Sequence, residues 1–278
     1  MNQLFSATQQ SHLYPMLLQA FSGLRQSWEG DWLGLSNVLK ACHAFLRAEN
    51  AKFQSSEAQN LMACALALSA HMELGVVTDR EPHYHNRLHT ADAMCGLAIL
   101  LEALNREGCA YSQEWMAALL LTVTAHDYLH PGGANSAPQE LELRTVKALD
   151  LFFLKNPISL VWQERINHMI LKTDPALVGA NHDKVAGRTF AMDLDWACVL
   201  MNEADILASA TDVFGPELGA QLASEWQLKN LPLHAIVGTK QGRLGFLKSL
   251  RFSSPGSLHL QLPQLIEQQV AHLSQFAK

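Results

Sequence analysis

The stretch MAALLLTVTAHDYLHPGGAN, Met116–Asn135, joins a strongly apolar run to a polar cluster that begins with His126 and Asp127. The apolar residues predict a buried helix, and Pro131 with the two glycines after it predicts that the helix breaks there. A carboxylate delivered into the interior costs free energy unless it is paired or bound to a metal ion. Imidazole and carboxylate side by side suit a divalent cation, so we expect further ligands elsewhere in the chain.

A second polar cluster, HYHNRLHTAD, occupies His83–Asp92. Pro82 disfavours helix in the residue before it, so a new helix is predicted to begin just after it. On that helix His85 and His89, four residues apart, would share one face, and Asp92 would follow one turn beyond His89. Two histidines at this spacing also occur on ordinary solvated faces, and the pair alone is weak support for a metal site.

A third stretch offers one more carboxylate. Phe190–Thr211 is predicted to form a long helix in which Asp205 is flanked by small and apolar residues. Together, two histidines and two aspartates make a mixed nitrogen and oxygen site suited to a hydrolytic divalent ion. The four candidate ligands are His89, His126, Asp127 and Asp205.

A site of this kind predicts hydrolytic chemistry. A divalent ion lowers the pKa of bound water and yields hydroxide near neutral pH. If one carboxylate bridges two ions, the hydroxide between them can attack phosphorus in line. The leaving alkoxide then needs a proton, and His85, which is not required as a ligand, could supply it as imidazolium.

The whole chain predicts an all-α protein. It has 278 residues, of which 49% are hydrophobic and 17% charged, which is enough for a sizeable core. Helical spacing of apolar residues recurs, and no alternation typical of strands persists. We expect one catalytic domain over 1–278, with a helical N-terminal scaffold over 1–50, a metal-site core over 80–250, and an irregular loop over 175–188.

Several classes of protein are disfavoured by composition. The net charge of −6 argues against a broad nucleic-acid-binding surface. The longest apolar runs fall well short of the roughly 20 residues that span a bilayer, so no membrane association is expected. The five cysteines are scattered without paired spacing, and no signal peptide is evident at the start, which favours reduced thiols and a cytoplasmic location.

Two extended motifs resemble those of a known family. YHNxxHxxD over Tyr84–Asp92 and HDxxHPGxxN over His126–Asn135 resemble the two signatures of class I 3′,5′-cyclic nucleotide phosphodiesterases. That family belongs to the wider HD-type metal phosphohydrolases, which are all-helical. The resemblance covers about residues 80–250. It implies hydrolysis of the 3′-phosphoester bond of cyclic AMP or cyclic GMP to the 5′-monophosphate, by hydroxide bridging two metal ions.

The same resemblance implies roles for individual residues. The tighter ion, usually zinc, would be held by His89, His126, Asp127 and Asp205. Asp127 would also bridge to a second ion, usually magnesium or manganese, and His85 would be the general acid. Three further residues would support the ligands or orient metal-bound water: His130, Glu142 and Asp92. For Glu142 the match crosses a shortened loop, so Glu140 is an alternative.

The expected substrate-binding residues match the family only in part. Tyr84 and Asn135 would shape the pocket, and Phe246 would stack on the base. Arg243 stands where the family has its purine-recognising glutamine. An arginine has five donors and no acceptor, so it cannot reproduce the donor-and-acceptor pairing that an amide offers.

That departure leaves two alternatives to a cyclic-nucleotide phosphodiesterase. One is an HD-type phosphohydrolase that acts on another phosphoester, with Arg243 binding an anionic group. The other is a nucleotide sensor that has kept the fold without catalysis.

Overall fold

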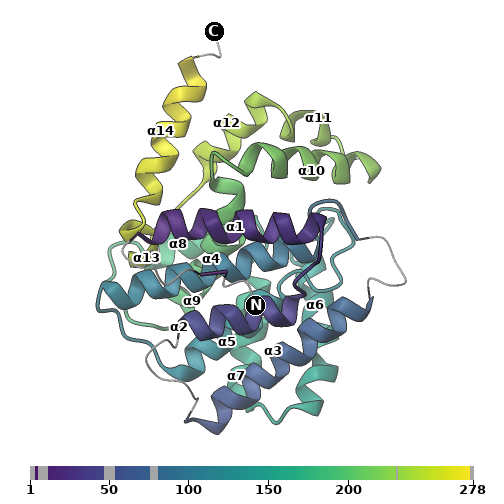
Figure 1. The fold of residues 1–278 in the computed structure, drawn as a ribbon, viewed down its shortest axis with the longest axis vertical. Helices are drawn as coiled ribbons and strands as arrows, with labels where there is room; N and C mark the ends of the chain where they lie inside the picture. The colour runs from purple at the N-terminus through teal and green to yellow at the C-terminus, as the bar shows by residue number, and fades with distance from the viewer. Residues whose placement is uncertain (1–3, 6–11, 47–53, 76–80, 230, 276–278) are drawn as a thin grey trace.

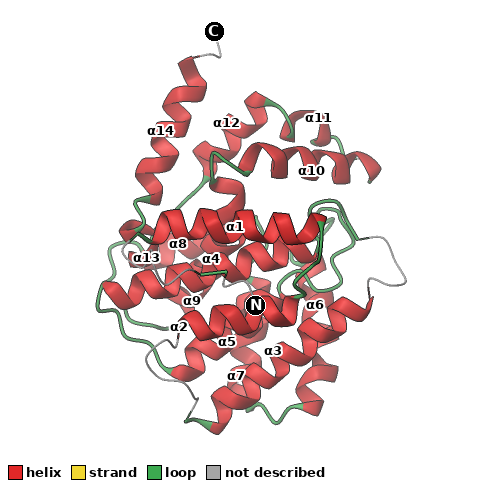
Figure 2. Cartoon of the chain, viewed as in Figure 1, coloured by secondary structure: helices red, strands yellow, loops and turns green. Residues whose placement is uncertain are grey.

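The computed structural model describes residues 4–5, 12–46, 54–75, 81–229 and 231–275. In these ranges the chain forms helices and no strand, which confirms the predicted all-α fold (Figures 1 and 2). The helices are α1 Leu13–Glu29, α2 Leu35–Leu46, α3 Ser56–Gly75, α4 Arg87–Arg106, α5 Gln113–Ala125, α6 Glu140–Lys155, α7 Leu160–Leu171, α8 Val178–Val185, α9 Leu194–Ala210, α10 Gly215–Leu228, α11 His234–Val237, α12 Lys240–Ser249, α13 Pro255–His259 and α14 Leu262–Gln275.

The centre of the molecule is built around α4, which packs against α1, α2, α5, α9 and α13. Almost every residue of α4 from Leu88 to Leu104 is buried, because the helix is apolar on all sides. α5 and α9 are buried in the same way. In Figure 1, α10, α11, α12 and α14 lie at one end of the molecule and α3, α5 and α7 at the other. Two of the candidate ligands, His89 and Asp205, therefore lie on deeply buried helices, and the other two directly follow a third.

The start of α4 differs from the prediction. Asn86 is the N-cap of this helix, with extended backbone, and its side chain accepts a hydrogen bond from the backbone N–H of His89. The first helical residue is therefore Arg87, and His85 lies in the segment before the helix. The expectation that His85 and His89 share one helix face is wrong. The helix begins only after the cap at Asn86, so His89 lies on it and His85 does not.

Two other boundaries also differ. The segment 175–188 was expected to be an irregular loop, but it contains α8, in which Asn181, His182 and Val185 are buried. Packing against α9 stabilises this short helix in spite of its weak intrinsic propensity. α9 begins at Leu194 rather than near Phe190, because the Asp193 side chain accepts from the backbone N–H of Trp196 and caps the helix.

None of the described helices combines the length and apolar character that crossing a lipid bilayer requires. All five cysteines are free thiols. Cys42, Cys64, Cys95 and Cys198 are buried, and Cys109 is partly buried.

Candidate metal centre

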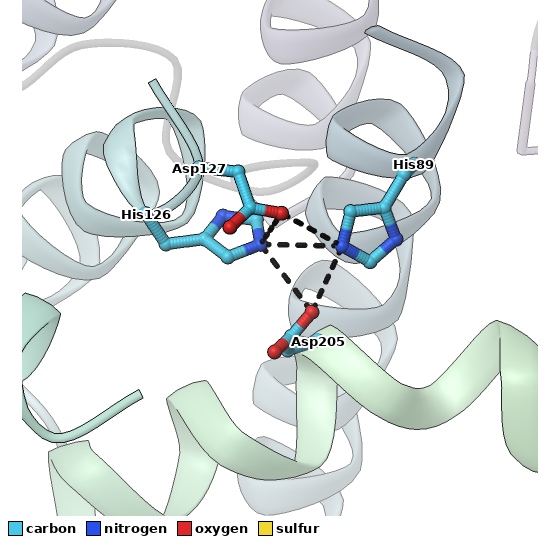
Figure 3. Close-up of side chains that lie close together, drawn as sticks. All are labelled: His89, His126, Asp127 and Asp205. Carbon is cyan, nitrogen blue, oxygen red and sulfur yellow. Dashed lines mark hydrogen bonds and ion pairs between the residues drawn. The ribbon is translucent and has the colours of Figure 1, made fainter. Parts of the chain in front are cut away.

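The four candidate ligands meet at one point in the core (Figure 3). His89 comes from α4, His126 and Asp127 follow the end of α5, and Asp205 comes from α9. His89 Nε2 lies 2.9 Å from Asp205 Oδ1 and 3.2 Å from Asp127 Oδ2. His126 Nε2 lies 3.3 Å and 3.4 Å from the same two oxygens. Three helices distant in sequence thus present two nitrogens and two oxygens to one small space.

The orientation of His126 is fixed by the backbone. Its Nδ1 lies 2.8 Å from the carbonyl oxygen of Val123, one turn earlier in the chain. Because a carbonyl only accepts, Nδ1 must donate, and Nε2 is left to bind an ion or a second proton. The side chain is almost completely buried, so this arrangement is held rigidly.

The two buried carboxylates of the cluster favour a bound cation. Burial by itself would lower the pKa of His89 and His126, but Asp127 and Asp205 raise both above the ordinary value of 6.5. Burial likewise opposes ionisation of the two carboxyls, yet the imidazoles beside them lower the pKa of Asp127 and of Asp205. Both carboxylates are therefore ionised at neutral pH and demand positive charge nearby.

One atom of the cluster lacks a partner. Oδ2 of Asp127 is buried and accepts no hydrogen bond of good geometry from the described residues, although both imidazoles are near. An unsatisfied buried carboxylate oxygen is costly, and a divalent ion would satisfy it. This orphaned oxygen, together with the two imidazole nitrogens and the second carboxylate, makes the residues fit a bound metal ion.

His85 lies beside the cluster and is held by Glu225 of α10. His85 Nδ1 lies 2.5 Å from Glu225 Oε1, and Glu225 Oε2 accepts from the backbone N–H groups of Tyr84 and His85 at 2.8 and 3.0 Å. Glu225 is buried, and the contact with His85 lowers its pKa although burial acts against this. Glu225 was not foreseen from the sequence, because it is 140 residues from His85 and lies in an ordinary amphipathic helix.

His130 lies against the ring of His85. The two ring centroids are 3.8 Å apart and the planes differ by 29°. Burial and the neighbouring His85 lower the pKa of His130 to about 4, so its ring is neutral at physiological pH. Gly132 donates to His130 Nδ1 and has a φ of +73°, and a Cβ added there would approach Pro82 and Glu225 to about 3 Å. Glycine is thus needed at position 132, where the sequence predicts the helix to end, because a residue without a Cβ lets this turn lie against Glu225.

Of the two glutamates considered on α6, Glu142 is buried and Glu140 is not. Asn135 donates its amide N–H to Glu142 Oε2 at 2.9 Å, and Glu142 is buried, which raises its pKa. Glu140 instead accepts hydrogen bonds from Ser136 and Arg144 near the surface. Asn135 therefore orients a buried carboxyl group.

Asp92 is held by an arginine from the N-terminal helix. Arg25 of α1 forms two parallel hydrogen bonds of 2.9 Å to the two oxygens of Asp92, which is 1% exposed. The Arg25 guanidinium also lies over the ring of Phe214, 4.2 Å from its centroid. This ion pair joins α1 to α4 three residues beyond His89. Arg25 carries no sequence signal for this role, because 67 residues separate it from Asp92.

The expected substrate-binding residues fall into two places. Tyr84 lies against the metal cluster, with its ring centroid 4.7 Å from that of His89 and its hydroxyl 2.9 Å from Ser209 Oγ. Arg243 instead donates to the backbone oxygens of Ser209 and Thr211 at the C-terminal end of α9. Phe246 is partly buried in a small apolar cluster formed by α12 and α14.

Some of the candidate site residues border a pocket of about 430 Å³. Asp127, His85 and His130 line it, together with the C-terminal end of α3 and the residues that precede α4. Neither Arg243 nor Phe246 lines this pocket. The structure therefore brings the four expected metal ligands together and places His85 and His130 beside them, whereas Arg243 and Phe246 lie outside this pocket.

Comparison with known proteins finds similarity in structure but not in sequence. No protein-family model matches the chain, and no curated protein matches it. The phosphodiesterase domain of Salpingoeca rosetta rhodopsin phosphodiesterase superposes with a TM-score of 0.64 at 16% identity, over 87% of this chain and 88% of that one. Yeast caPDE2 superposes with a TM-score of 0.51 at 12% identity, over 87% of this chain and 73% of the other. At these identities the similarity establishes a shared fold.

Proposed function

We propose that the protein is a metal-dependent phosphodiesterase that hydrolyses the 3′-phosphoester bond of a 3′,5′-cyclic nucleotide to the 5′-monophosphate. The observation that carries the proposal is the convergence of four metal-binding side chains with a histidine held by a buried glutamate, at the border of one pocket. The fold shared with two phosphodiesterase structures supports it.

The metal-binding side chains would hold two divalent ions. His89, His126, Asp127 and Asp205 would bind the tighter ion, for which the mixed nitrogen and oxygen donors suit zinc. Asp127 would also reach a second ion, magnesium or manganese, with Glu142 oriented toward its water ligands by Asn135. When bound, such ions supply an activated water and neutralise charge on the phosphate.

His85 would protonate the leaving 3′ oxygen. Because the carboxylate of Glu225 only accepts, Nδ1 of His85 donates to it, and Nε2 is the nitrogen that can carry and release a proton. Two further hydrogen bonds from the backbone N–H groups of Tyr84 and His85 hold the Glu225 carboxylate in place, so the ring of His85 has a fixed orientation. The neutral ring of His130 keeps the plane of His85 fixed without adding a competing positive charge.

Arg243 gives little support to an alternative substrate with a second anionic group. Its guanidinium already donates to backbone oxygens of α9 and to the side chain of Gln269. An arginine whose donors are occupied in this way has a structural role at the end of a helix. We therefore do not propose the phosphohydrolase with an Arg243 clamp.

The proposal is tested by incubating the 278-residue protein, loaded with zinc and with magnesium or manganese, with cyclic AMP and with cyclic GMP. Formation of a 5′-monophosphate from at least one of them is expected. Asp127→Ala, which removes the orphaned carboxylate, should lose bound metal and fall to background turnover. If metal-replete wild-type protein turns over no cyclic nucleotide, the proposed function is wrong.

A further inference from the structure

The segment from Trp226 to Ile266 contains no acidic residue. It covers the last residues of α10, the helices α11, α12 and α13, and the start of α14, and it holds five lysines and arginines. The whole chain has the opposite balance, with 26 Asp and Glu against 20 Lys and Arg. Positive charge is therefore concentrated in one segment of an acidic protein, and such a concentration attracts anionic partners.

This segment has an exposed corner, which we call the α10–α11 corner. It is formed by the end of α10, by α11 and by the start of α12, over 227–229 and 231–241, and in Figure 1 it lies at the outer edge of the molecule. Three large apolar side chains are exposed there: Leu228 to 68%, Leu233 to 56% and Ile236 to 50%. Two exposed lysines, Lys229 and Lys240, lie within four residues of them. A single exposed leucine is ordinary, but a group of apolar side chains beside lysines is typical of a contact surface.

The backbone of the α10–α11 corner is well defined. The N–H of Leu231 donates to the carbonyl oxygen of Trp226 at 3.0 Å as the chain leaves α10. The chain after α11 then passes so close to α10 that a Cβ added at Gly238 would lie 3.0 Å from the Cβ of Ala223. A partner can therefore bury the exposed apolar side chains without first having to order the chain that carries them.

The two helices that pack most extensively against α11, α10 and α12, bring no exposed acidic group to the corner. The sequence of α12 contains no acidic residue. In α10, Glu217 lies in the first turn, about 16 Å along the helix axis from Leu228. Glu225 is buried and accepts from the backbone N–H groups of Tyr84 and His85. The exposed charge that α10, α11 and α12 place at this corner is therefore positive.

The chemistry of the corner matches an anionic lipid surface. Leucine and isoleucine side chains can enter the acyl region of one leaflet while lysines stay at the phosphates of the headgroups. A nucleic-acid site would instead present arginines or large aromatic rings to phosphates and bases, and the described residues of the corner include neither. A second copy of the chain, related by a two-fold axis, would bring the lysines of the two corners together, and like charges oppose such a contact.

We propose that the α10–α11 corner binds the surface of an anionic membrane. Leu228, Leu233 and Ile236 enter the acyl region, and Lys229 and Lys240 contact the headgroup phosphates. Such a contact requires no helix that crosses the bilayer. It differs from the expectation, drawn from the lengths of the apolar runs, that the chain has no membrane association. The four candidate metal ligands lie on or directly after α4, α5 and α9, so the inference does not depend on the proposed function.

The experiment measures binding of the metal-loaded 278-residue protein to lipid vesicles by sedimentation, after unbound ions have been removed. One set of vesicles is pure phosphatidylcholine, and the other is an equal mixture of phosphatidylcholine and phosphatidylserine. We expect binding to the mixed vesicles alone, and weaker binding as the salt concentration rises, because salt screens exposed charges. Equal binding to both sets, or binding to neither, would overturn the proposal.

Two variants separate the apolar and the charged parts of the contact. Leu233→Ser combined with Ile236→Ser removes two inserted side chains and should weaken binding to the mixed vesicles more than about tenfold. Lys229→Gln should weaken it about fivefold, and this loss should shrink at high salt. All three side chains are exposed, so the melting temperature should change little. Full binding by both variants would mean that another surface meets the lipid and that the proposal is wrong.

A matched control lies on α6. Leu154 is 83% exposed and Lys155 beside it is exposed, but Asp150, one turn earlier on the same helix, is exposed as well. Leu154→Ser combined with Lys155→Gln should therefore leave binding to the mixed vesicles unchanged. If this control loses binding while the variants at the α10–α11 corner keep it, the lipid surface is bound by α6 and the proposal is wrong.

Two other results would overturn the proposal by identifying a different partner. If wild-type protein binds no vesicle but binds a DNA or RNA oligonucleotide, and Lys229→Gln weakens that binding, the corner is a nucleic-acid site. If it binds no vesicle but forms a dimer that Leu233→Ser with Ile236→Ser dissociates, the corner is a contact between copies. Hydrolysis of a cyclic nucleotide in solution is a separate measurement that these variants should leave unchanged, so failure of the proposed function is distinguishable from failure of this inference.

Discussion

Short sequence motifs predict the positions of side chains well in the metal cluster and poorly at the α10–α14 end of the molecule. The four candidate ligands lie on, or directly after, three core helices, and their imidazole nitrogens lie 2.9–3.4 Å from carboxylate oxygens of the cluster. At the other end, Arg243 and Phe246 match the expected positions in sequence, yet one caps α9 and the other packs in an apolar cluster. Motif spacing predicts a site well when buried helices carry it, and poorly when the position depends on how peripheral helices pack.

The largest effect on activity is expected for His85, the proposed general acid, which contacts Glu225 of α10 beside the metal cluster. His85→Ala should lower kcat for the cyclic nucleotide about 10²–10⁴-fold, because proton transfer to the leaving oxygen is lost. Metal content should stay near the wild-type value, since the ligand cluster does not include His85. Elemental analysis beside steady-state kinetics measures both. Loss of metal from this variant would mean that His85 is a ligand and not the acid.

A smaller effect is expected when only the support of that acid is changed. Glu225→Gln keeps the shape of the side chain but removes the charge that faces Nδ1 of His85. We expect kcat to fall about 10–100-fold, as for other residues that orient a reacting histidine. Steady-state kinetics measures this loss. An unchanged kcat in this variant would mean that the Glu225 carboxylate does not orient His85.

The metal cluster should also make the melting temperature of the metal-free protein depend on pH. The carboxylates raise the pKa of His89 and His126 in the folded protein above 6.5. Their contribution to stability is complete below pH 6.5 and is lost as pH rises through the raised values. Metal-free protein should therefore melt at lower temperature as pH rises above neutrality. Metal-loaded protein should not show this decline, because both imidazoles are then neutral ligands.

The smallest effect on activity is expected for Arg243, at the α10–α14 end of the molecule. Arg243→Ala removes hydrogen bonds to Ser209, Thr211 and Gln269, which should cost about 1–3 kcal/mol of stability. The kcat/KM for cyclic nucleotide should change less than about twofold when measured well below the melting temperature, because Arg243 does not line the pocket. A tenfold change in either direction would place Arg243 in substrate binding and remove the contrast between the two regions.

The all-α fold could be predicted because helical periodicity is a local pattern. The four candidate ligands could be proposed because the dipeptide HD places an imidazole beside a carboxylate, and because His89 and Asp205 lie in helical stretches that can supply the remaining donors. The start of α4 was misplaced, because the cap at Asn86 competes with helix over the same polar residues. Glu225 and Arg25 could not be predicted, since their partners His85 and Asp92 lie 140 and 67 residues away and no local pattern marks either pair.

The ion pair between Arg25 and Asp92 changes where the smallest working unit of this protein begins. Both motifs lie after residue 80, so a shortened chain that starts there would contain every proposed ligand and the acid. It would also leave Asp92 as an uncompensated charge in the core, three residues from His89. Helix α1, which carries no motif, is thus a required part of the folded unit that positions the candidate ligands, and the limits of the motifs are a poor guide to the limits of that unit.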